Sequence, residues 1–302
     1  MAKAAVTMSG GSLAGRPASV PLGPWSWRWV AAVAVGGVAV SGRVSPTLLL
    51  ALGVVAGLPH GTADLDGGRR AFRSYGKQWW QPFLGVYLGL IAAVLLAWRL
   101  CPAATLVGFL FLSMIHFGRQ DRQDRCRSLA WVVAQGAAPV IVPAVVHGGK
   151  VERLFAVLAG DGAPAIVAAL SGPVSAVWCA SIAVAFYQIG DSAERRSEAA
   201  ELALVVLLFA LTTPLVAFAF YFALLHTPRA LVAQRIQGAG SSWASMTALT
   251  LLACALGAGI FVVAPGLTFD ADVVRTAFML LAALTVPHMA LDHLERGGGA
   301  VA

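Results

Sequence analysis

Apolar segments about as long as a membrane-spanning helix recur along most of this chain, and they restrict what it can fold into. Roughly 20 apolar residues in helical conformation cross the hydrocarbon core of a bilayer. Hydrophobic residues make up 59% of the 302 residues, charged residues only 12%, and the mean hydropathy is +0.79. These values lie outside the usual range of soluble domains. The sequence therefore predicts an all-α, polytopic membrane bundle of roughly eight to ten transmembrane helices.

The apolar segments can be placed along the chain individually. The predicted spans are 25–42, 45–61, 82–98, 102–118, 129–147, 174–190, 199–228, 245–264 and 273–291. The segment 154–172 is less apolar and contains Gly160-Asp161-Gly162, so it is predicted to be a loop with an interfacial helix. The segment 199–228 is too long for one upright span and contains Pro214, which leaves open one kinked helix or two short passes.

The same segments define the domain organisation. Residues 25–296 are predicted to form a single integral membrane domain. Residues 1–24 are rich in Ala, Gly, Ser and Pro and lack the compact apolar core of a signal peptide, so we expect a disordered tail there. Residues 297–302 are expected to form a short C-terminal tail. The cysteines are isolated, with no CxxC pair, and are interpreted as ordinary apolar or loop residues.

Basic residues indicate the orientation. A formal net charge of +7 would suggest nucleic acid as a partner of a soluble chain, but here arginines gather in loops between apolar segments. Arg69, Arg70, Arg73 and Lys77 follow the second predicted span, and further arginines follow the fourth and the sixth. The positive-inside rule assigns these loops to the cytoplasmic side. We therefore predict a multi-pass protein of the cell membrane that contacts the lipid bilayer and no nucleic acid.

Four of the six histidines each close an apolar segment just before the chain becomes polar. They are His60, His116, His226 and His288. The first two end spans that run in the same direction, and the other two join them at that depth if 199–228 crosses twice. One histidine at a helix end is often an interface residue, but four at matched ends favour a shared site. Neutral imidazole binds iron, zinc and copper, so the pattern predicts one of these metals.

Acidic residues near the histidines are candidates for orienting them. Asp64 lies four residues after His60, and Asp121 lies five after His116. Carboxylates of this kind often hold a metal-binding imidazole through its other ring nitrogen, although solvation or pairing with nearby arginines explains them equally well. Asp292, one helical turn after His288, could orient that histidine in the same way. His147 and His293 are not predicted to be ligands.

Four ordered motifs carry a family resemblance: Pro59-His60-Gly61, His116-Phe117-Gly118, His226-Thr227-Pro228-Arg229 and Pro287-His288-Met289. In motif order, spacing and hydropathy, the chain from about residue 45 to 295 resembles the Brp/Blh family of bacterial β-carotene 15,15′-dioxygenases. The resemblance implies a membrane-embedded non-haem Fe(II) enzyme that splits the central double bond of β-carotene with O2 to give two retinal molecules. It also implies a functional link to a retinal-binding rhodopsin.

The family's iron ligands carry over to His60, His116 and His226. A further family ligand, four residues after the third, is replaced here by Ala230, which cannot bind metal. Three outcomes remain open: a three-histidine site with a position left for water or oxygen, a site completed by His288, or a lost or changed activity. We favour the three-histidine site with His288 as the substitute ligand.

An apolar polyene also needs apolar walls. Aromatic residues in the predicted spans are the wall candidates: Phe109, Phe111, Phe117, Tyr187, Phe218, Phe220, Tyr221 and Phe222. Two other classes of function also place histidines in membrane helices, namely a transporter or channel and a bis-histidine haem or quinone protein. The alanine at position 230 adds a third, a family member that acts on another carotenoid or is not catalytic.

Overall fold

A computed structural model describes residues 27–120, 128–189, 193–236, 242–263, 266 and 268–298, and within these ranges the chain is helical, without a β-strand. The α-helices are α1 Trp27–Val40, α2 Pro46–Gly57, α3 Asp64–Ala71, α4 Trp80–Leu100, α5 Pro102–Gln120, α6 Leu129–Gly136, α7 Ala138–Val146, α8 Gly148–Ala159, α9 Ala163–Ala169, α10 Ser175–Ile189, α11 Ala193–Leu211, α12 Pro214–Tyr221, α13 Thr227–Ile236, α14 Trp243–Val263 and α15 Phe269–Gly298. The 3₁₀ or π-helical segments are η1 Leu58–Ala63, η2 Arg73–Gln78, η3 Gly160–Gly162, η4 Leu170–Val174 and η5 Phe222–His226. The predicted all-α class is confirmed, and the predicted tail 1–24 lies outside the described residues.

Seven helical stretches in the described part of the chain are long and apolar enough to cross a membrane, or eight if the bent pair α6 and α7 is one span. The two helices of that pair meet at 49°. These numbers confirm a polytopic bundle and lie at or just below the lower edge of the predicted range. The first predicted span, 25–42, contains only the 14-residue helix α1, which is shorter than a full crossing.

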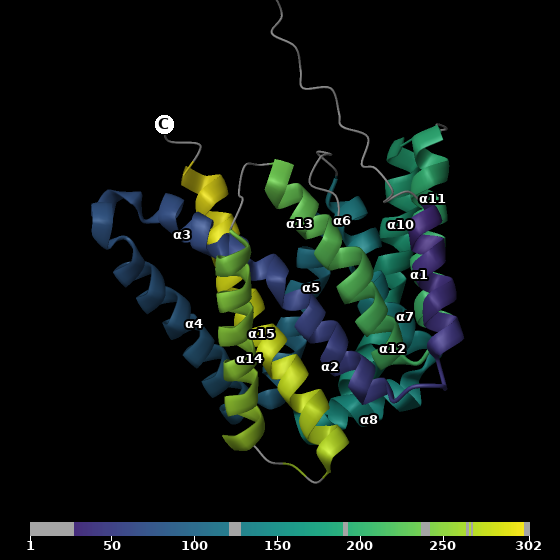
Figure 1. The fold of residues 1–302 in the computed structure, drawn as a ribbon. Helices are drawn as coiled ribbons and strands as arrows, with labels where there is room; N and C mark the ends of the chain where they lie inside the picture. Colours follow the sequence, from purple (N-terminus) through teal and green to yellow (C-terminus); the bar gives the residue numbers. More distant parts are fainter. Residues whose placement is uncertain are drawn as a thin grey trace, which may run out of the picture.

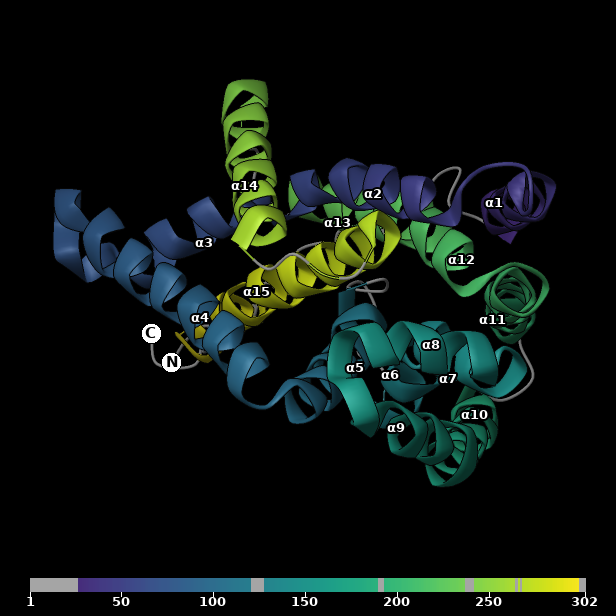
Figure 2. The same cartoon turned by 90° about the horizontal axis from the view of Figure 1, so that it is seen from below.

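Successive long helices run in alternating directions through the bundle (Figure 1). As a result α2, α5, the pair α12 and α13, and α15 all run the same way and finish at the same end of the molecule. Viewed along the bundle, α15 passes through the middle, and it packs against α2 and α8 as well as α4 and α14 (Figure 2). The shared direction is what the histidine pattern required for a common depth.

The segment 199–228 belongs to two helices that run in opposite directions, which excludes a single kinked helix. Helix α11 ends at Leu211, Thr213 is extended (ψ 148°), and Pro214 starts α12 in the opposite direction (Figure 1). Proline disfavours helical backbone at the preceding residue but is accommodated in the first turn of a helix. The chain therefore turns back at Pro214. The stretch Pro214–Arg235 is among the seven that are long and apolar enough to cross a membrane, whereas α11, which begins with a charged segment, is not. Two crossings by 199–228 remain a prediction.

The prediction of a loop at 154–172 is wrong. The chain there is helical, through α8, η3, α9 and η4, and η4 continues directly into α10. Gly160 has a φ of +59°, so the turn signal at Gly-Asp-Gly is real but occupies only the short junction between two helices. Val151, Phe155 and Leu158 of α8 are buried in the core, and this burial stabilises helix on either side of the glycines.

The helix ends next to the predicted basic loops lie together. Helix α3 and segment η2, the C-terminal end of α5 and the N-terminal end of α11 all lie at one end of the bundle (Figure 1). These are the positions that follow the second, fourth and sixth predicted spans. The assignment of this end to the cytoplasm remains a prediction.

Glycines set how closely the helices that carry the histidines approach each other. A Cβ on Gly53 of α2 would lie 2.9 Å from the Cα of Ala219 in α12, and one on Gly57 would overlap the ring of Phe222 in η5. Likewise, a Cβ on Gly136 of α6 would meet the backbone of Gly118 in α5. Small residues at such positions allow backbones in a membrane bundle to touch. The motif glycine after His116 therefore has a packing role.

Candidate metal centre

His226 lies at the end of the π-helical segment η5, an unusual backbone form that often marks functional sites. Pro228 follows two residues later and has no N–H to donate to the carbonyl of Leu224, four residues before it. The indole Nε1 of Trp29 in α1 donates to that carbonyl at 2.8 Å. The irregular turn that presents His226 is thus stabilised from a neighbouring helix, and the His226 side chain is fully buried.

His60 lies on the 3₁₀ segment η1, which Pro59 helps to start directly after α2. Its Nδ1 is 2.5 Å from the carbonyl oxygen of Gly57, so Nδ1 carries the proton and Nε2 keeps its lone pair. The backbone on both sides of the ring is fixed by α13: Gln234 Nε2 donates to the carbonyl of His60 at 2.6 Å, and the Thr227 hydroxyl donates to that of Gly57 at 3.4 Å. Contacts from α13 therefore position His60, and the same helix begins directly after His226.

His116, in the last turns of α5, completes a compact group with these two residues. One ligand nitrogen from each of His60, His116 and His226 lies within 4.8 Å of the others. Two nitrogens bound to one ion at about 2.0–2.1 Å lie within about 4 Å of each other, so small side-chain rotations would suffice. Neutral imidazoles match the preference of iron, zinc and copper, and the donor set therefore fits the predicted kind of metal.

His288, on α15, lies beside this group. Its ring centroid is 5.2 Å from that of His116 and 6.0 Å from that of His60. Its Nδ1 is 2.5 Å from Oδ1 of Asp64, and the other carboxylate oxygen of Asp64 accepts a 2.8 Å hydrogen bond from the Tyr87 hydroxyl. Because a carboxylate only accepts, Nδ1 of His288 is the protonated nitrogen and Nε2 keeps the lone pair. A ligand histidine held by a carboxylate has this arrangement.

Aromatic rings enclose the histidine group. Phe222 stacks on His226 with 17° between the planes, and Phe117 meets the same ring edge to face at a centroid distance of 4.8 Å. The ring centroids of Phe222 and His60 are also only 5.6 Å apart. These rings cover imidazole surface that water would otherwise reach, so the buried nitrogens sit in an apolar surrounding.

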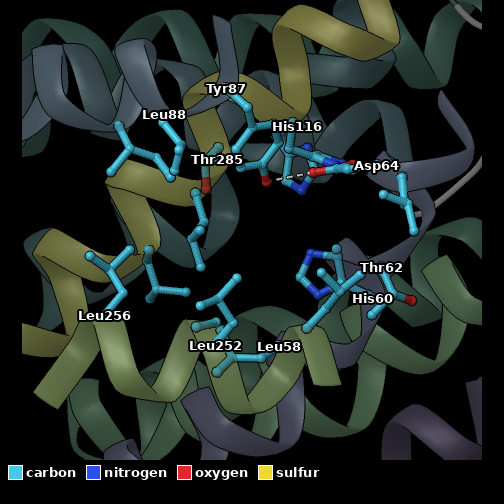
Figure 3. Close-up of a pocket in the computed structure, with 18 of the residues that line it drawn as sticks. Leu58, His60, Thr62, Asp64, Tyr87, Leu88, His116, Leu252, Leu256 and Thr285 are labelled. Carbon is cyan, nitrogen blue, oxygen red and sulfur yellow. Dashed lines mark hydrogen bonds and ion pairs between the residues drawn. The ribbon is translucent and has the colours of Figure 1, made fainter. Parts of the chain in front are cut away.

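A cavity of about 420 Å³ opens next to the histidines, within the usual size range of small-molecule sites. His60, His116, His288 and Asp64 line its polar part, and apolar side chains, among them leucines of α4, α14 and α15, line most of the rest. Figure 3 shows His60 and His116 toward one end, with Leu88 and Leu256 away from them at the other. The cavity therefore joins a group of possible metal ligands to a mostly apolar chamber.

The predicted site residues differ in part from their predicted positions and partners. Asp64 lies at the site, but the imidazole that it holds is that of His288, and His60 is held by a backbone carbonyl. Asp121 lies outside the described residues. Ala230 is fully buried on α13, one turn after His226, and offers no ligand atom. His147 and His293 do not belong to the three-histidine group found among the described residues.

The predicted aromatic walls are half right. Of the eight candidates, these line the cavity: Phe109, Phe117, Phe218 and Phe222. Phe111 and Tyr187 instead point away from the bundle, with 61% and 87% of their surfaces exposed. Tyr87, Phe83 and the leucines of α14 line the cavity without having been predicted. The role of Tyr87 could not be predicted from the sequence. It lies inside an apolar span, 23 residues after Asp64, and no local pattern indicates that the two side chains meet.

The fold and the site together define a polytopic membrane protein with a buried histidine centre beside an apolar cavity. Comparison with known families matches residues 51–294 to the family described as beta-carotene 15,15'-dioxygenase. The chain belongs to this family of carotenoid-cleaving dioxygenases, which confirms the resemblance inferred from the four histidine motifs.

Two curated relatives agree. The "Beta-carotene 15,15'-dioxygenase" of the uncultured marine bacterium 66A03 is 30% identical over 266 residues, covering 80% of this chain and 90% of the relative. The "Probable beta-carotene 15,15'-dioxygenase Blh" of Halobacterium salinarum is 27% identical over 301 residues, covering 85% and 86%. No solved structure matches the chain significantly. Nothing in these comparisons favours the transporter or the haem alternative.

Proposed function

We propose that this protein cleaves the central 15,15′ double bond of β-carotene with O2 and releases two molecules of retinal, using an iron ion held by the histidine cluster. Family membership supports the reaction. The observation that carries the assignment to a site is the convergence of His60, His116 and His226 on one point beside an apolar cavity.

Iron would be held by the Nε2 atoms that remain available once the other ring nitrogens are engaged, as at His60. Three neutral imidazoles leave the charge of ferrous iron uncompensated and further coordination positions open. When bound, iron supplies the one-electron and O2 chemistry that no amino-acid side chain provides. The donor set itself is the reason to expect a late first-row metal rather than magnesium or calcium, which prefer oxygen ligands.

The chain's own residues bind and orient the substrate. Phe109, Phe117 and Phe222 line the cavity, the last two in contact with the histidines, and apolar and aromatic surfaces of this kind bind a conjugated hydrocarbon. The enclosed rings exclude water from the reacting bond, which suppresses side reactions of activated oxygen. Binding the polyene with its centre next to the cluster would select the 15,15′ bond over others.

His288 is proposed as the fourth ligand, replacing the histidine that Ala230 has removed. Its Nδ1 contacts Asp64, so Nε2 is the atom that would bind a metal, and its ring centroid lies 5.2 Å from that of His116. Its ring would have to move closer to join the three nitrogens that lie within 4.8 Å of one another. Asp64 then acts as the residue that orients His288, and Tyr87 in turn holds Asp64.

Expression in cells that accumulate β-carotene tests the reaction. We expect the orange colour to fade and retinal to appear, and we expect no retinal from the His226→Ala variant. Persistent β-carotene with the wild-type protein present in the membrane would refute the proposal. Expression in cells that accumulate a ring-hydroxylated carotenoid instead tests whether the buried alanine at position 230 accompanies a different carotenoid preference, because cleavage of that substrate would yield a ring-substituted product.

Metal analysis of purified variants tests the ligands. His60→Ala, His116→Ala and His226→Ala should each lose most of the bound iron, and His288→Ala should lose a large part of it. His147→Ala is the matched control, because His147 lies between α7 and α8 and outside the cluster. Full iron retention by His288→Ala would exclude His288 as a ligand and leave a three-histidine site.

The apolar helices and the charge pattern also support proposals for the location and partners of the protein. The apolar helices and the basic loops support a multi-pass protein of the cell membrane with its histidine-bearing end toward the cytoplasm. Retinal is an apolar product that would leave into the bilayer, where a retinal-binding rhodopsin could take it up. Fractionation of cell membranes and reporter fusions at the C-terminus test this placement.

A further inference from the structure

Some residues that line the cavity also face outward from the bundle. Leu84 and Leu88 of α4 and Leu252 of α14 line the cavity, yet 40%, 56% and 66% of their surfaces are exposed. A side chain that borders a cavity and is exposed on the outside lies at the mouth of that cavity. The mouth is therefore formed by leucines of α4 and α14.

The packing of these two helices leaves room for such a mouth. Helix α15 packs against both α4 and α14, whereas α4 and α14 make no extensive contact with each other in the described part of the chain. They are also the two least buried spans, with 17% and 11% of their apolar windows buried. In Figure 2 they extend from α15 in different directions. Helices α4 and α14 can therefore lie apart while both remain packed against α15.

The mouth lies at the depth of the hydrocarbon core. Leu88 follows the start of α4 by eight residues and Leu252 follows the start of α14 by nine, which places both about 12–14 Å along their helices. A bilayer core is about 30 Å thick, so this is close to its middle. The opening therefore faces lipid tails rather than water.

The polarity of the cavity changes along its length. The mouth is formed by leucines, and the polar groups His60, Thr62 and Asp64 lie away from Leu88 and Leu256 (Figure 3). A wholly apolar molecule can pass such a mouth without stripping water from a charge. A charged molecule would lose its water there and meet mainly leucines, with the hydroxyl of Thr285 near Leu88 as a polar group (Figure 3).

We propose that the substrate, a long apolar polyene dissolved in the bilayer, reaches the histidine cluster sideways through a portal between α4 and α14, lined by Leu84, Leu88 and Leu252. This inference rests on the proposed carotenoid cleavage. It adds the route and the residues that control it. The portal also accounts for the marginal burial of α14, because that helix forms one wall of a passage.

Tryptophan substitutions test the portal with matched controls. Leu88→Trp and Leu252→Trp should narrow it, whereas Leu96→Trp and Leu251→Trp place the same bulk on the same helices at positions that do not line the cavity. The pairs are matched in exposure, 56% against 58% on α4 and 66% against 63% on α14. In liposomes containing β-carotene, the two portal variants should cleave on the order of tenfold more slowly than wild type, an added barrier of about 1.4 kcal/mol. The two controls should keep the wild-type rate.

Further measurements distinguish a failure of the portal proposal from a failure of the proposed function. Bound iron and thermal stability should be unchanged in all four variants, and the carotenoid that co-purifies should fall only in the portal variants. Wild-type rates in Leu88→Trp and Leu252→Trp, or equal losses in the controls, would overturn the portal. If the wild-type protein itself left β-carotene intact, the proposed function would fail, and the amount of bound carotenoid would still decide the portal.

Discussion

The contact between Asp64 and His288 joins residues that are 224 positions apart in the sequence. Each of the two was visible beforehand as a polar residue at the end of an apolar segment. Their pairing was not, because Asp64 lies one helical turn from His60 and local spacing favours that partner. In the 3₁₀ segment η1, however, His60 turns toward the carbonyl of Gly57, and Asp64 contacts His288 instead.

Removing the charge of Asp64 tests its role in holding His288. Asp64→Asn keeps the size of the side chain but weakens its acceptance from Nδ1, so metal affinity should fall by about 10- to 100-fold. Tyr87→Phe removes one hydrogen bond to the carboxylate, worth about 0.5–1.5 kcal/mol, and should have a smaller effect. Titration of iron into metal-free protein measures both. Asp66→Asn, two residues along α3, is the control; equal losses in Asp66→Asn and Asp64→Asn would contradict the role.

At the scale of elements, the apolar segments predicted most helices, and the errors have definite causes. A Gly-Asp-Gly turn signal does not reveal how short a turn is when buried apolar residues continue the helix on both sides, as at 154–172. Pro214 marked the turn between α11 and α12, but whether it bends or reverses a helix depends on packing that no local pattern records. The π-helical turn before His226 likewise depends on Trp29, a distant residue.

The contact between α2 and α12 should tolerate no added methyl group at Gly53. A Cβ there would lie 2.9 Å from the Cα of Ala219, and backbone cannot move aside as a flexible side chain can. Gly53→Ala should therefore cost about 1–3 kcal/mol of stability and displace His60 from His226. Gly89→Ala is the control, since a Cβ on this residue of α4 would meet nothing within 4 Å. Thermal unfolding in detergent measures the difference; equal melting temperatures for the two variants would contradict the close contact.

Arg229, in the motif that begins with His226, pairs with Glu201 of α11 at 2.8 Å, and both side chains are at most 10% exposed. Breaking a buried ion pair leaves an uncompensated charge and typically costs about 3–5 kcal/mol. Arg229→Leu alone should therefore destabilise the protein strongly. The double variant Arg229→Leu with Glu201→Leu should recover much of the loss. Additive losses in a double-mutant cycle would show that the pair does not couple α11 to α13.

At the scale of the whole molecule, the alternating directions of the helices bring the four histidines together. Counting spans from the sequence predicted this convergence on the condition that 199–228 crosses twice, and the reversal of direction between α11 and α12 gives His226 the orientation that this condition requires. What counting could not supply is the lateral spacing of the helices, which depends on glycine contacts and on the position of α15 in the middle of the bundle. The cavity and its mouth are consequences of that spacing.

A metal that joins α5, η1 and η5 should stabilise the whole bundle. A ligand that binds only the folded protein at a hundred times its Kd adds about 2.7 kcal/mol. Removing iron with a chelator should therefore lower the unfolding temperature, and ferrous iron should restore it. The His116→Ala variant should respond to neither treatment. An unfolding temperature of the wild-type protein that is indifferent to iron would argue against a metal bound by these three elements.

The most direct test of the account is turnover by the purified protein in liposomes, with β-carotene, O2 and one equivalent of ferrous iron. We predict that retinal is the only cleavage product, two molecules for each β-carotene consumed, and that the His116→Ala variant forms none under the same conditions. Intact β-carotene with fully iron-loaded wild-type protein, or retinal formation that survives loss of His116, would contradict the claim that the histidine cluster is the centre of central carotenoid cleavage.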